Sequence, residues 1–197
     1  MEINLGGCRE NYRYFRSKLE AATKLLVLVK ANAYGHGAVE FASLMEEAGA
    51  DYLAVAYPVE GMELRQGGIK SPIMVLTAGT DSFEQIINYG LEPGIPNIYS
   101  LKVLCDVLEK RGMNDFPVHI KLDTGMHRLG FNPETDMPRL IDRLLSQTAL
   151  VPCSVFSHFV GSDGDEFDAF SVEQFELYDK ASRQLQAAYP HKIIRHI

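Results

Sequence analysis

The sequence predicts a parallel α/β fold, and three observations carry that prediction. Short apolar runs recur along the 197 residues, with longer amphipathic stretches between them. The runs are rich in Val, Ile and Leu without alternating between apolar and polar residues, which is typical of strands buried on both faces. No linker, low-complexity tract or block of charge divides the chain, so we expect a single domain over residues 1–197.

We expect seven strands. In chain order they are Leu25–Val29, Tyr52–Ala56, Ile73–Leu76, a weak run near Ile95–Tyr99, Val118–Leu122, Leu150–Phe156 and Ile193–Ile197. Repeated strand–helix alternation fits either an open doubly wound sheet or a (β/α)8 barrel. A barrel needs eight strands and typically about 250 residues. Periodicity therefore leaves two alternatives, an open sheet or a barrel that is one strand short.

The segments between the runs have helical periodicity. Apolar residues at helical spacing predict helices over about Cys8–Ala21, Leu101–Leu108, Met137–Leu144 and Phe175–Ala188. The spacings of Asp81 with Glu84 and of Ser171 with Gln174 are those of capping boxes at helix starts. Pro133, directly after Asn132, is expected at the first position of a helix.

Composition excludes several classes of function. Lys and Arg total 19 against 26 Asp and Glu, a net charge of −7, which argues against a nucleic-acid partner. No apolar run approaches the roughly 18 residues of a membrane helix, and the charged start MEINLGGCRE is unlike a signal peptide. Cys8, Cys105 and Cys153 are far apart and form neither a disulfide framework nor a zinc motif. We therefore expect a soluble, acidic, cytoplasmic domain.

A lysine follows the first strand directly. Lys30 ends the apolar run and precedes the segment Ala31-Asn32-Ala33-Tyr34-Gly35-His36-Gly37. Partial removal from water at the end of a buried strand favours the neutral, nucleophilic amine that a Schiff base requires. The alternative is a lysine that extends its amine into solvent, which is the more common situation for a lone lysine. The segment matches no glycine-rich phosphate-binding pattern.

Polar residues also follow the later strands, where parallel α/β folds gather functional groups. The fifth strand ends in Lys121 and Asp123, and Arg128 follows, which could clamp a carboxylate or a phenolate or simply pair with Asp123. His158 follows the sixth strand and His196 lies in the last one. The imidazole of a histidine at such a place can stack on a flat ring or donate a proton, although a lone histidine is more often a hydrogen-bonded structural residue. Neither has the spacing of a metal site, so we expect no metal.

At these motifs the sequence resembles the alanine racemases, which are pyridoxal-phosphate (PLP) enzymes. Two long motifs carry the resemblance, Val29–Gly37 and Lys121–Gly130. Weaker matches, spread in family order over the whole chain, are Glu2–Leu5 with Asn11-Tyr12, Glu60-Gly61 with Leu64-Arg65, and Ser157–Phe159. The resemblance implies a (β/α)8 TIM-like barrel of the alanine racemase N-terminal type, here with about seven of eight strands and truncated at its C-terminal end.

The resemblance also implies roles for individual residues. Lys30 would hold PLP as an aldimine and act as one catalytic base, and Tyr34 would reach the cofactor phosphate. Arg128 would lie beside the cofactor's phenolic oxygen and the substrate carboxylate. His158 would pack near the pyridine ring. His196 is expected among the cofactor contacts for a different reason, because its position near the end of the last strand would bring it to the same barrel mouth as Lys30, Lys121 and His158. Lys121 matches a position that is carbamylated in some members, where it would help to orient the arginine.

The implied reaction interconverts L-alanine and D-alanine for cell-wall peptidoglycan. Inversion at Cα requires bases on opposite faces of the substrate. In the family the second base is a tyrosine of a C-terminal β-domain from the partner subunit of a homodimer, and no tyrosine of this chain matches it. We therefore expect the 197 residues alone to racemise poorly. The alternatives are a single-domain PLP-binding homeostasis protein, a PLP decarboxylase of the same fold, a racemase acting on serine, and a non-catalytic domain for binding or assembly.

Overall fold

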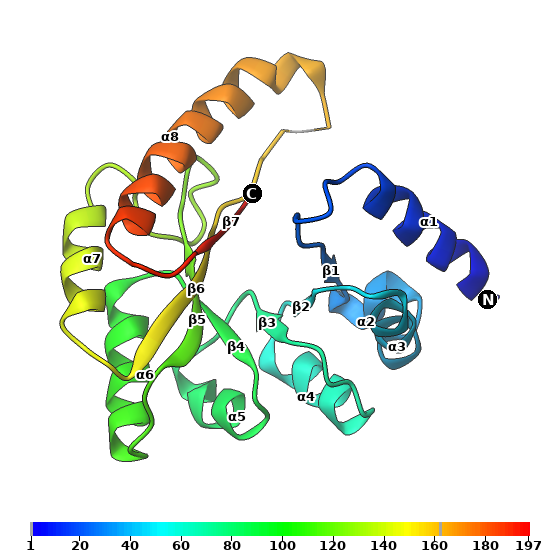
Figure 1. Ribbon diagram of the computed structural model, residues 1–197, viewed down its shortest axis with the longest axis horizontal. Helices are drawn as coiled ribbons and strands as arrows, with labels where there is room; N and C mark the ends of the chain where they lie inside the picture. Colours follow the sequence, from blue (N-terminus) through cyan, green and yellow to red (C-terminus); the bar gives the residue numbers. More distant parts are fainter. Residues whose placement is uncertain (1, 162) are drawn as a thin grey trace. The chain divides into compact units, whose positions relative to one another are not determined.

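The computed structural model describes residues 2–161 and 163–197, and Figure 1 shows its elements coloured in chain order. Seven strands in this part of the chain pair in parallel in the order β1-β2-β3-β4-β5-β6-β7. A doubly wound sheet reverses its strand order at one point, whereas a (β/α)8 barrel keeps the order of the sequence. The strictly sequential order shows that the open doubly wound alternative is wrong.

The chain divides into two compact units, residues 1–93 and 94–197. In the first unit one helix precedes the first strand, and further helices of different lengths lie between the strands. Its elements are α1 (Leu5–Ser17), β1 (Leu26–Leu28), α2 (Lys30–Gly35), α3 (Ala38–Ala48), β2 (Tyr52–Val55), α4 (Pro58–Gln66), β3 (Ile73–Val75), η1 (Thr80–Ser82), α5 (Phe83–Asn88) and the first half of β4 (Glu92–Ile95).

Burial in the first unit follows the position of each strand. Leu53, Ala54 and Val55 of β2 are consecutive and fully buried, as expected of a strand covered on both faces. In β1, by contrast, Leu28 is 39% exposed. Among the described residues β1 pairs with β2 alone, with Leu26 opposite Tyr52. The expectation of burial on both faces is therefore confirmed for β2 and wrong for β1.

Arg65, near the end of α4, joins the loop that follows α4 to the loop that follows α5. Its Nε donates to the Tyr89 carbonyl at 3.1 Å, and one Nη donates to the carbonyls of Ile69 and Ser71 at 2.8 Å each. The other Nη donates to the Gly90 carbonyl at 3.0 Å. Burial lowers the pKa of Arg65 from its ordinary value. The guanidinium group of arginine carries several N–H donors in one plane, and it can therefore donate hydrogen bonds to four carbonyls at once.

The second unit repeats the strand–helix pattern with longer elements. They are the second half of β4, α6 (Ile98–Lys110), β5 (Phe116–Lys121), α7 (Met137–Leu145), β6 (Leu150–Phe156), η2 (Asp165–Phe167), α8 (Asp168–Ala187) and β7 (Ile194–His196). The apolar face of α6 is fully buried through Leu101, Leu104 and Leu108, which confirms the predicted helix. Tyr178 of α8 donates from its buried hydroxyl to the Val155 carbonyl of β6 at 3.0 Å.

Several predicted boundaries are wrong. The weak strand near residues 95–99 lies earlier, at Glu92–Ile95, because the Asn97 side chain accepts the Ser100 N–H at 2.8 Å and starts α6. The first helix is Leu5–Ser17 rather than Cys8–Ala21, because Asn4 caps it by accepting the Gly7 N–H at 3.0 Å.

The predicted helix-start signals also fail. Ser82, not Asp81, precedes α5. Ser171 lies inside α8, which begins at Asp168, so it cannot cap that helix. Asn132 bonds the N–H of Glu134 at 2.8 Å in a turn, and α7 begins only at Met137, so Pro133 starts a turn rather than a helix.

We expect the Arg65→Met variant to lose about 3 kcal/mol of the free energy of unfolding, because several carbonyls lose their only charged donor. Urea unfolding followed by circular dichroism measures this loss. The matched control is Arg139→Met on the exposed face of α7, which should change stability by less than about 0.5 kcal/mol. Equal stability of the two variants would contradict a structural role for Arg65.

Candidate functional site

Lys30 lies at the carboxyl end of β1, and a left-handed turn begins directly after it. The four residues that follow, Ala31 to Tyr34, all have positive φ, between 50° and 55°, with ψ between 34° and 52°. They form a left-handed helical turn. Each such residue other than glycine costs roughly 1–2 kcal/mol. A strained backbone of this kind persists only where its surroundings enforce it, and it is frequent at functional sites.

Backbone hydrogen bonds connect the turn to the residues before and after it. The Ala33 N–H donates to the Val29 carbonyl at 3.0 Å, and the Gly37 N–H donates to the Asn32 carbonyl at 3.2 Å. The Asn32 side chain accepts the Ala38 N–H at 2.8 Å and so joins the turn to the start of α3. Asn is one of the few residues that tolerate left-handed backbone. The turn is thereby a defined element that fixes where Lys30 leaves the strand.

A carboxylate from α4 bonds the same turn. Glu60 accepts the Ala31 N–H at 2.7 Å through one oxygen. Its second oxygen accepts the N–H groups of Ala56 and Tyr57 at 2.7 and 2.9 Å. Because carboxylate acceptors make the stronger class of hydrogen bond, Glu60 links the turn after β1 firmly to the end of β2.

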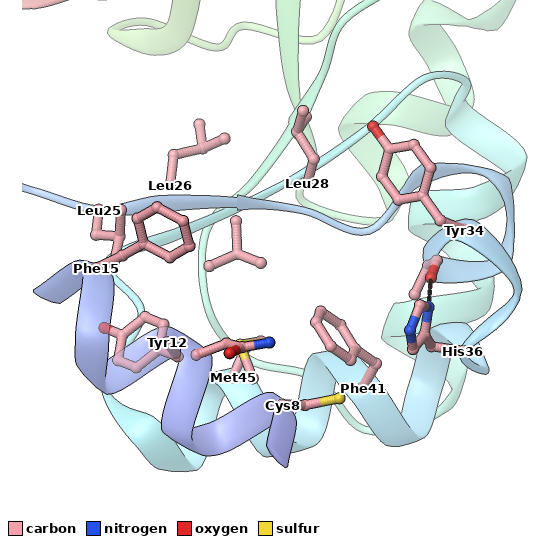
Figure 2. Close-up of a pocket in the computed structure, with 13 residues that line it drawn as sticks. Cys8, Tyr12, Phe15, Leu25, Leu26, Leu28, Tyr34, His36, Phe41 and Met45 are labelled. Atoms are coloured by element: carbon pink, nitrogen blue, oxygen red, sulfur yellow. Dashed lines mark hydrogen bonds between the residues drawn. The ribbon is translucent and has the colours of Figure 1, made fainter. Parts of the chain in front are cut away.

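Tyr34 ends the left-handed turn beside Lys30. The Lys30 amine lies 5.9 Å from the centroid of the Tyr34 ring. Figure 2 shows the Tyr34 hydroxyl directed away from His36, toward the side of β1 on which Leu26 and Leu28 project. Tyr34 is 59% exposed. The structure therefore brings together the two predicted site residues of the first unit.

A cavity of about 400 Å³ adjoins this turn, and Figure 2 shows its lining. The lining is mostly apolar and includes Phe15, Phe41 and Met45, but Lys30 does not contribute to it. The Tyr12 hydroxyl is buried there without a hydrogen-bond partner, and burial raises its pKa. Tyr34, whose ring centroid lies 5.9 Å from the Lys30 amine, is also among the lining residues, so the cavity adjoins the turn that carries both predicted site residues.

In the second unit, Arg128 lies on a loop that is held at both ends. Asp123 accepts the N–H groups of Gly125 and His127 at 3.1 and 2.9 Å. Gly130 has φ +139°, and a Cβ there would lie 2.5 Å from the Asp123 nitrogen, so only glycine fits this close approach. Arg128 itself is exposed. Asp123 therefore shapes the loop through backbone N–H groups, an arrangement different from the simple Asp123–Arg128 pair considered above.

Lys121 and His196 both contact the ring of Phe156. The Lys121 amine lies 5.7 Å from the ring centroid. The imidazole of His196 stacks on the ring at 5.2 Å with an interplanar angle of 4°. Lys121 is 8% exposed. The structure thus brings together two predicted site residues of the second unit around one aromatic ring.

A chain of hydrogen bonds runs from the half-buried His196 into the core. Its Nε2 is 3.2 Å from the Ser154 hydroxyl, and that hydroxyl is 2.7 Å from Nδ1 of His119. Burial, reinforced by the nearby His119, lowers the pKa of His196 to about 4. His196 is therefore neutral at physiological pH and acts as a hydrogen-bonding ring rather than a cation.

His158 is exposed in the loop after β6, and α8 holds the backbone of that loop. Gln174 donates to the His158 carbonyl at 3.1 Å and accepts the Val160 N–H at 3.1 Å. Gln174 is fully buried and also reaches the Thr124 hydroxyl, at 3.4 Å. The loops after β5 and β6 are therefore joined through a single side chain of α8.

Sequence reasoning gave no role to Glu60, His119 or Ser154, and it assigned Gln174 only to a capping box. Glu60 was quoted only as part of a weak motif, and its signal is a glutamate in the first turn of a helix that follows a strand. His119 and Ser154 occupy inward positions of predicted strands, where a polar residue within an apolar run is itself a signal. Partners for such residues come from other strands, so the sequence alone does not name them.

Within residues 2–161 and 163–197, no group of three or more His, Cys, Asp or Glu side chains is arranged to hold a metal ion. Across the same residues, none of the helices has the length and apolar character needed to span a bilayer.

The model of one protein family matches almost the whole chain. Its description is "Alanine racemase, N-terminal domain", and it matches residues 3–197. An alanine racemase of Clostridium kluyveri is 40% identical over 179 residues, which are 90% of this chain and 45% of the relative. An alanine racemase of Synechocystis is 37% identical over 190 residues, 95% of this chain and 50% of the relative.

Solved structures agree in fold. An alanine racemase of Clostridium difficile 630 matches with a TM-score of 0.91 and 33% identity, over 98% of this chain and 50% of that one. An alanine racemase of E. faecalis matches with a TM-score of 0.85 and 28% identity. The chain spans about half the length of the relatives it matches. The predicted TIM-like α/β fold is confirmed.

We expect acid to destabilise the protein through His196. Its pKa is about 4 in the folded state against an ordinary 6.5, so between these values the unfolded chain binds a proton that the folded chain does not. The free energy of unfolding therefore falls as pH drops from about 6.5 to 4, by up to about 3 kcal/mol from this group. Urea unfolding at stepped pH measures the slope.

The His196→Gln variant should lose that part of the slope. His127→Asn is the matched control, because His127 is exposed and Asn tolerates its positive φ of 53°. If the His196 variant keeps the wild-type slope, His196 is not the buried neutral group described above.

Proposed function

Because this chain belongs to the alanine racemase N-terminal domain family, we propose that it serves a PLP-dependent racemase that interconverts L-alanine and D-alanine. One observation carries the proposal. A lysine stands at the carboxyl end of the first barrel strand, on a strained turn that the surrounding hydrogen bonds enforce. Functional groups of barrel enzymes gather at this end of the strands.

The residues present fit the cofactor chemically. An amine is the group that binds a carbonyl cofactor covalently, and Lys30 offers one at a half-buried position. Tyr34 beside it offers a phenol for a phosphate oxygen. In the second unit Arg128 offers a cation for phenolate or carboxylate oxygens, and His158 and His196 offer flat rings. When bound, PLP serves as an electron sink that makes the substrate Cα proton acidic.

The chain's own residues would then divide the work. Lys30 would attach the cofactor and exchange a proton with the substrate Cα on one face. Tyr34 would bind the cofactor phosphate, and Arg128 would bind oxygens of cofactor and substrate. His158 and His196 would contact the cofactor ring, and Lys121, carbamylated or not, would orient Arg128. The assignment of His196 rests on its position near the end of the last strand, and the other assignments rest on the family motifs that the residues match.

Inversion needs a second base on the opposite face. We propose that a partner subunit of a homodimer supplies it, as the family resemblance implies. We also place the enzyme in the cytoplasm, where its product would serve peptidoglycan synthesis. A single-domain PLP-binding homeostasis protein is the competing function, and the exchange experiment below separates the two.

We expect PLP followed by borohydride to label Lys30. Mass spectrometry of the labelled peptides locates the reduced adduct. The Lys30→Ala variant should lose this label, whereas Lys24→Ala should keep it, because Lys24 is an exposed lysine just before β1. If neither this chain nor a longer form carrying the second base becomes labelled at Lys30, the PLP proposal is wrong.

We expect the 197 residues alone to racemise alanine at least about 100-fold more slowly than a form that carries the second base, because one general base contributes a factor of about 10²–10⁴. Deuterium incorporation at Cα, followed by proton NMR, measures exchange, and chiral chromatography measures inversion. Rapid racemisation by the 197 residues would contradict the two-subunit proposal. If the longer form shows no deuterium exchange at Cα, the PLP-binding homeostasis protein is favoured. Release of carbon dioxide from the amino acid would favour a decarboxylase.

A further inference from the structure

The geometry points to Glu60 as a positioning residue for the Lys30 amine. The carboxylate does not act on the substrate. It holds the left-handed turn that begins at Lys30 and so fixes where the amine is presented. The inference rests on the proposed function of Lys30 as the cofactor lysine.

The first support is the arrangement of the hydrogen bonds. One Glu60 oxygen accepts the Ala31 N–H at 2.7 Å, and the other accepts the N–H groups of Ala56 and Tyr57 at 2.7 and 2.9 Å. The Ala31 N–H belongs to the peptide plane that joins the Cα atoms of Lys30 and Ala31. Since peptide groups are planar, a bond to this N–H fixes the orientation of the plane that leaves Lys30. The bond thus acts directly on the backbone at the lysine.

The second support is the strain of the turn. Residues 31–34 hold four consecutive positive φ values without a glycine among them. Relaxation of even the first residue to an ordinary right-handed conformation would swing the chain away from its present path. The bond to Glu60 is made at that first residue and therefore opposes this relaxation directly.

The third support is that Glu60 itself is well anchored. It lies in the first turn of α4 behind Pro58, where the helix dipole favours a carboxylate. Gly61 packs so closely on Leu91 that a Cβ there would lie 2.9 Å from a Leu91 methyl carbon. The Val29 N–H also donates to the Ala54 carbonyl at 2.8 Å, which keeps β1 in register with β2. The position of the Glu60 carboxylate is therefore fixed by the packing of α4.

The test measures cofactor attachment rather than turnover. Purified apo protein is mixed with a range of PLP concentrations, and the rate of borohydride-trapped labelling at Lys30 is followed by mass spectrometry. The Glu60→Gln variant should lower the maximal labelling rate about tenfold or more, because an amide cannot accept from all three N–H groups. The PLP concentration that gives half the maximal rate should change less than about threefold, because Glu60 is not proposed to contact the cofactor.

Two further variants sharpen the result. Glu63→Gln is the matched control, with the same charge change on an exposed position of α4, and should label like the wild type. Glu60→Asp retains the charge with a shorter reach and should give an intermediate rate. It also supplies the test if the glutamine variant does not fold. Hydrogen exchange of the Ala31 amide should quicken about tenfold in Glu60→Gln, while the β2 amides remain protected.

The outcomes separate the two proposals. If the wild type labels at Lys30 and folded Glu60 variants label at the same maximal rate, the positioning role is wrong and the proposed function stands. Equal loss in Glu60→Gln and Glu63→Gln would likewise overturn the role, because any charge change on α4 would then suffice. If the wild type does not label at Lys30 even in the longer form, the proposed function fails and the inference falls with it.

Discussion

The candidate site in the first unit depends on holding four successive residues in a left-handed conformation that none of them prefers. Isolated, residues 31–34 would relax by several kcal/mol. They remain left-handed because Asn32, Glu60 and the Val29 carbonyl each satisfy a backbone N–H in or beside the turn. These hydrogen bonds offset the cost of the left-handed backbone, and they thereby determine the path of the chain after Lys30.

The second unit positions its candidate residues by a different physical means. There the polar groups are buried and satisfied by one another, as in the chain from His119 through Ser154 to His196. A satisfied buried network resists rearrangement because breaking any bond leaves a polar atom without a partner. The loop after β5 is likewise held by Asp123 and by the close approach at Gly130. The candidate residues of the second unit are therefore held in place because a buried polar atom that loses its hydrogen bond cannot bond to water instead. Those of the first unit are held in place by the backbone geometry of the left-handed turn.

Much of the fold could be predicted from the sequence because buried parallel strands and amphipathic helices leave strong patterns. β2 and β6 lie within one residue of their predicted bounds. The turn after Lys30 could not be predicted in this way, because Ala31 and Ala33 are ordinary helix formers and hydrophobic patterning carries no information on the sign of φ. The fourth strand was misplaced because Ile95 and Ile98 look alike as apolar residues, although Asn97 separates a strand from a helix. The contacts of Glu60 join segments 29 and 4 residues away, so they emerge only once the strands are paired.

The sequential strand order has a consequence for how the protein folds. Every strand pairs with the next strand along the chain, and the most distant pairing, Ser154 with Ile194, spans 40 residues. Because the entropy of closing a loop grows only with the logarithm of its length, each strand–helix–strand step has a similar and moderate closure cost. Contacts that are local in sequence favour rapid folding. Assembly can thus advance stepwise from a neighbouring strand pair, as expected of a chain that forms during synthesis from its amino end.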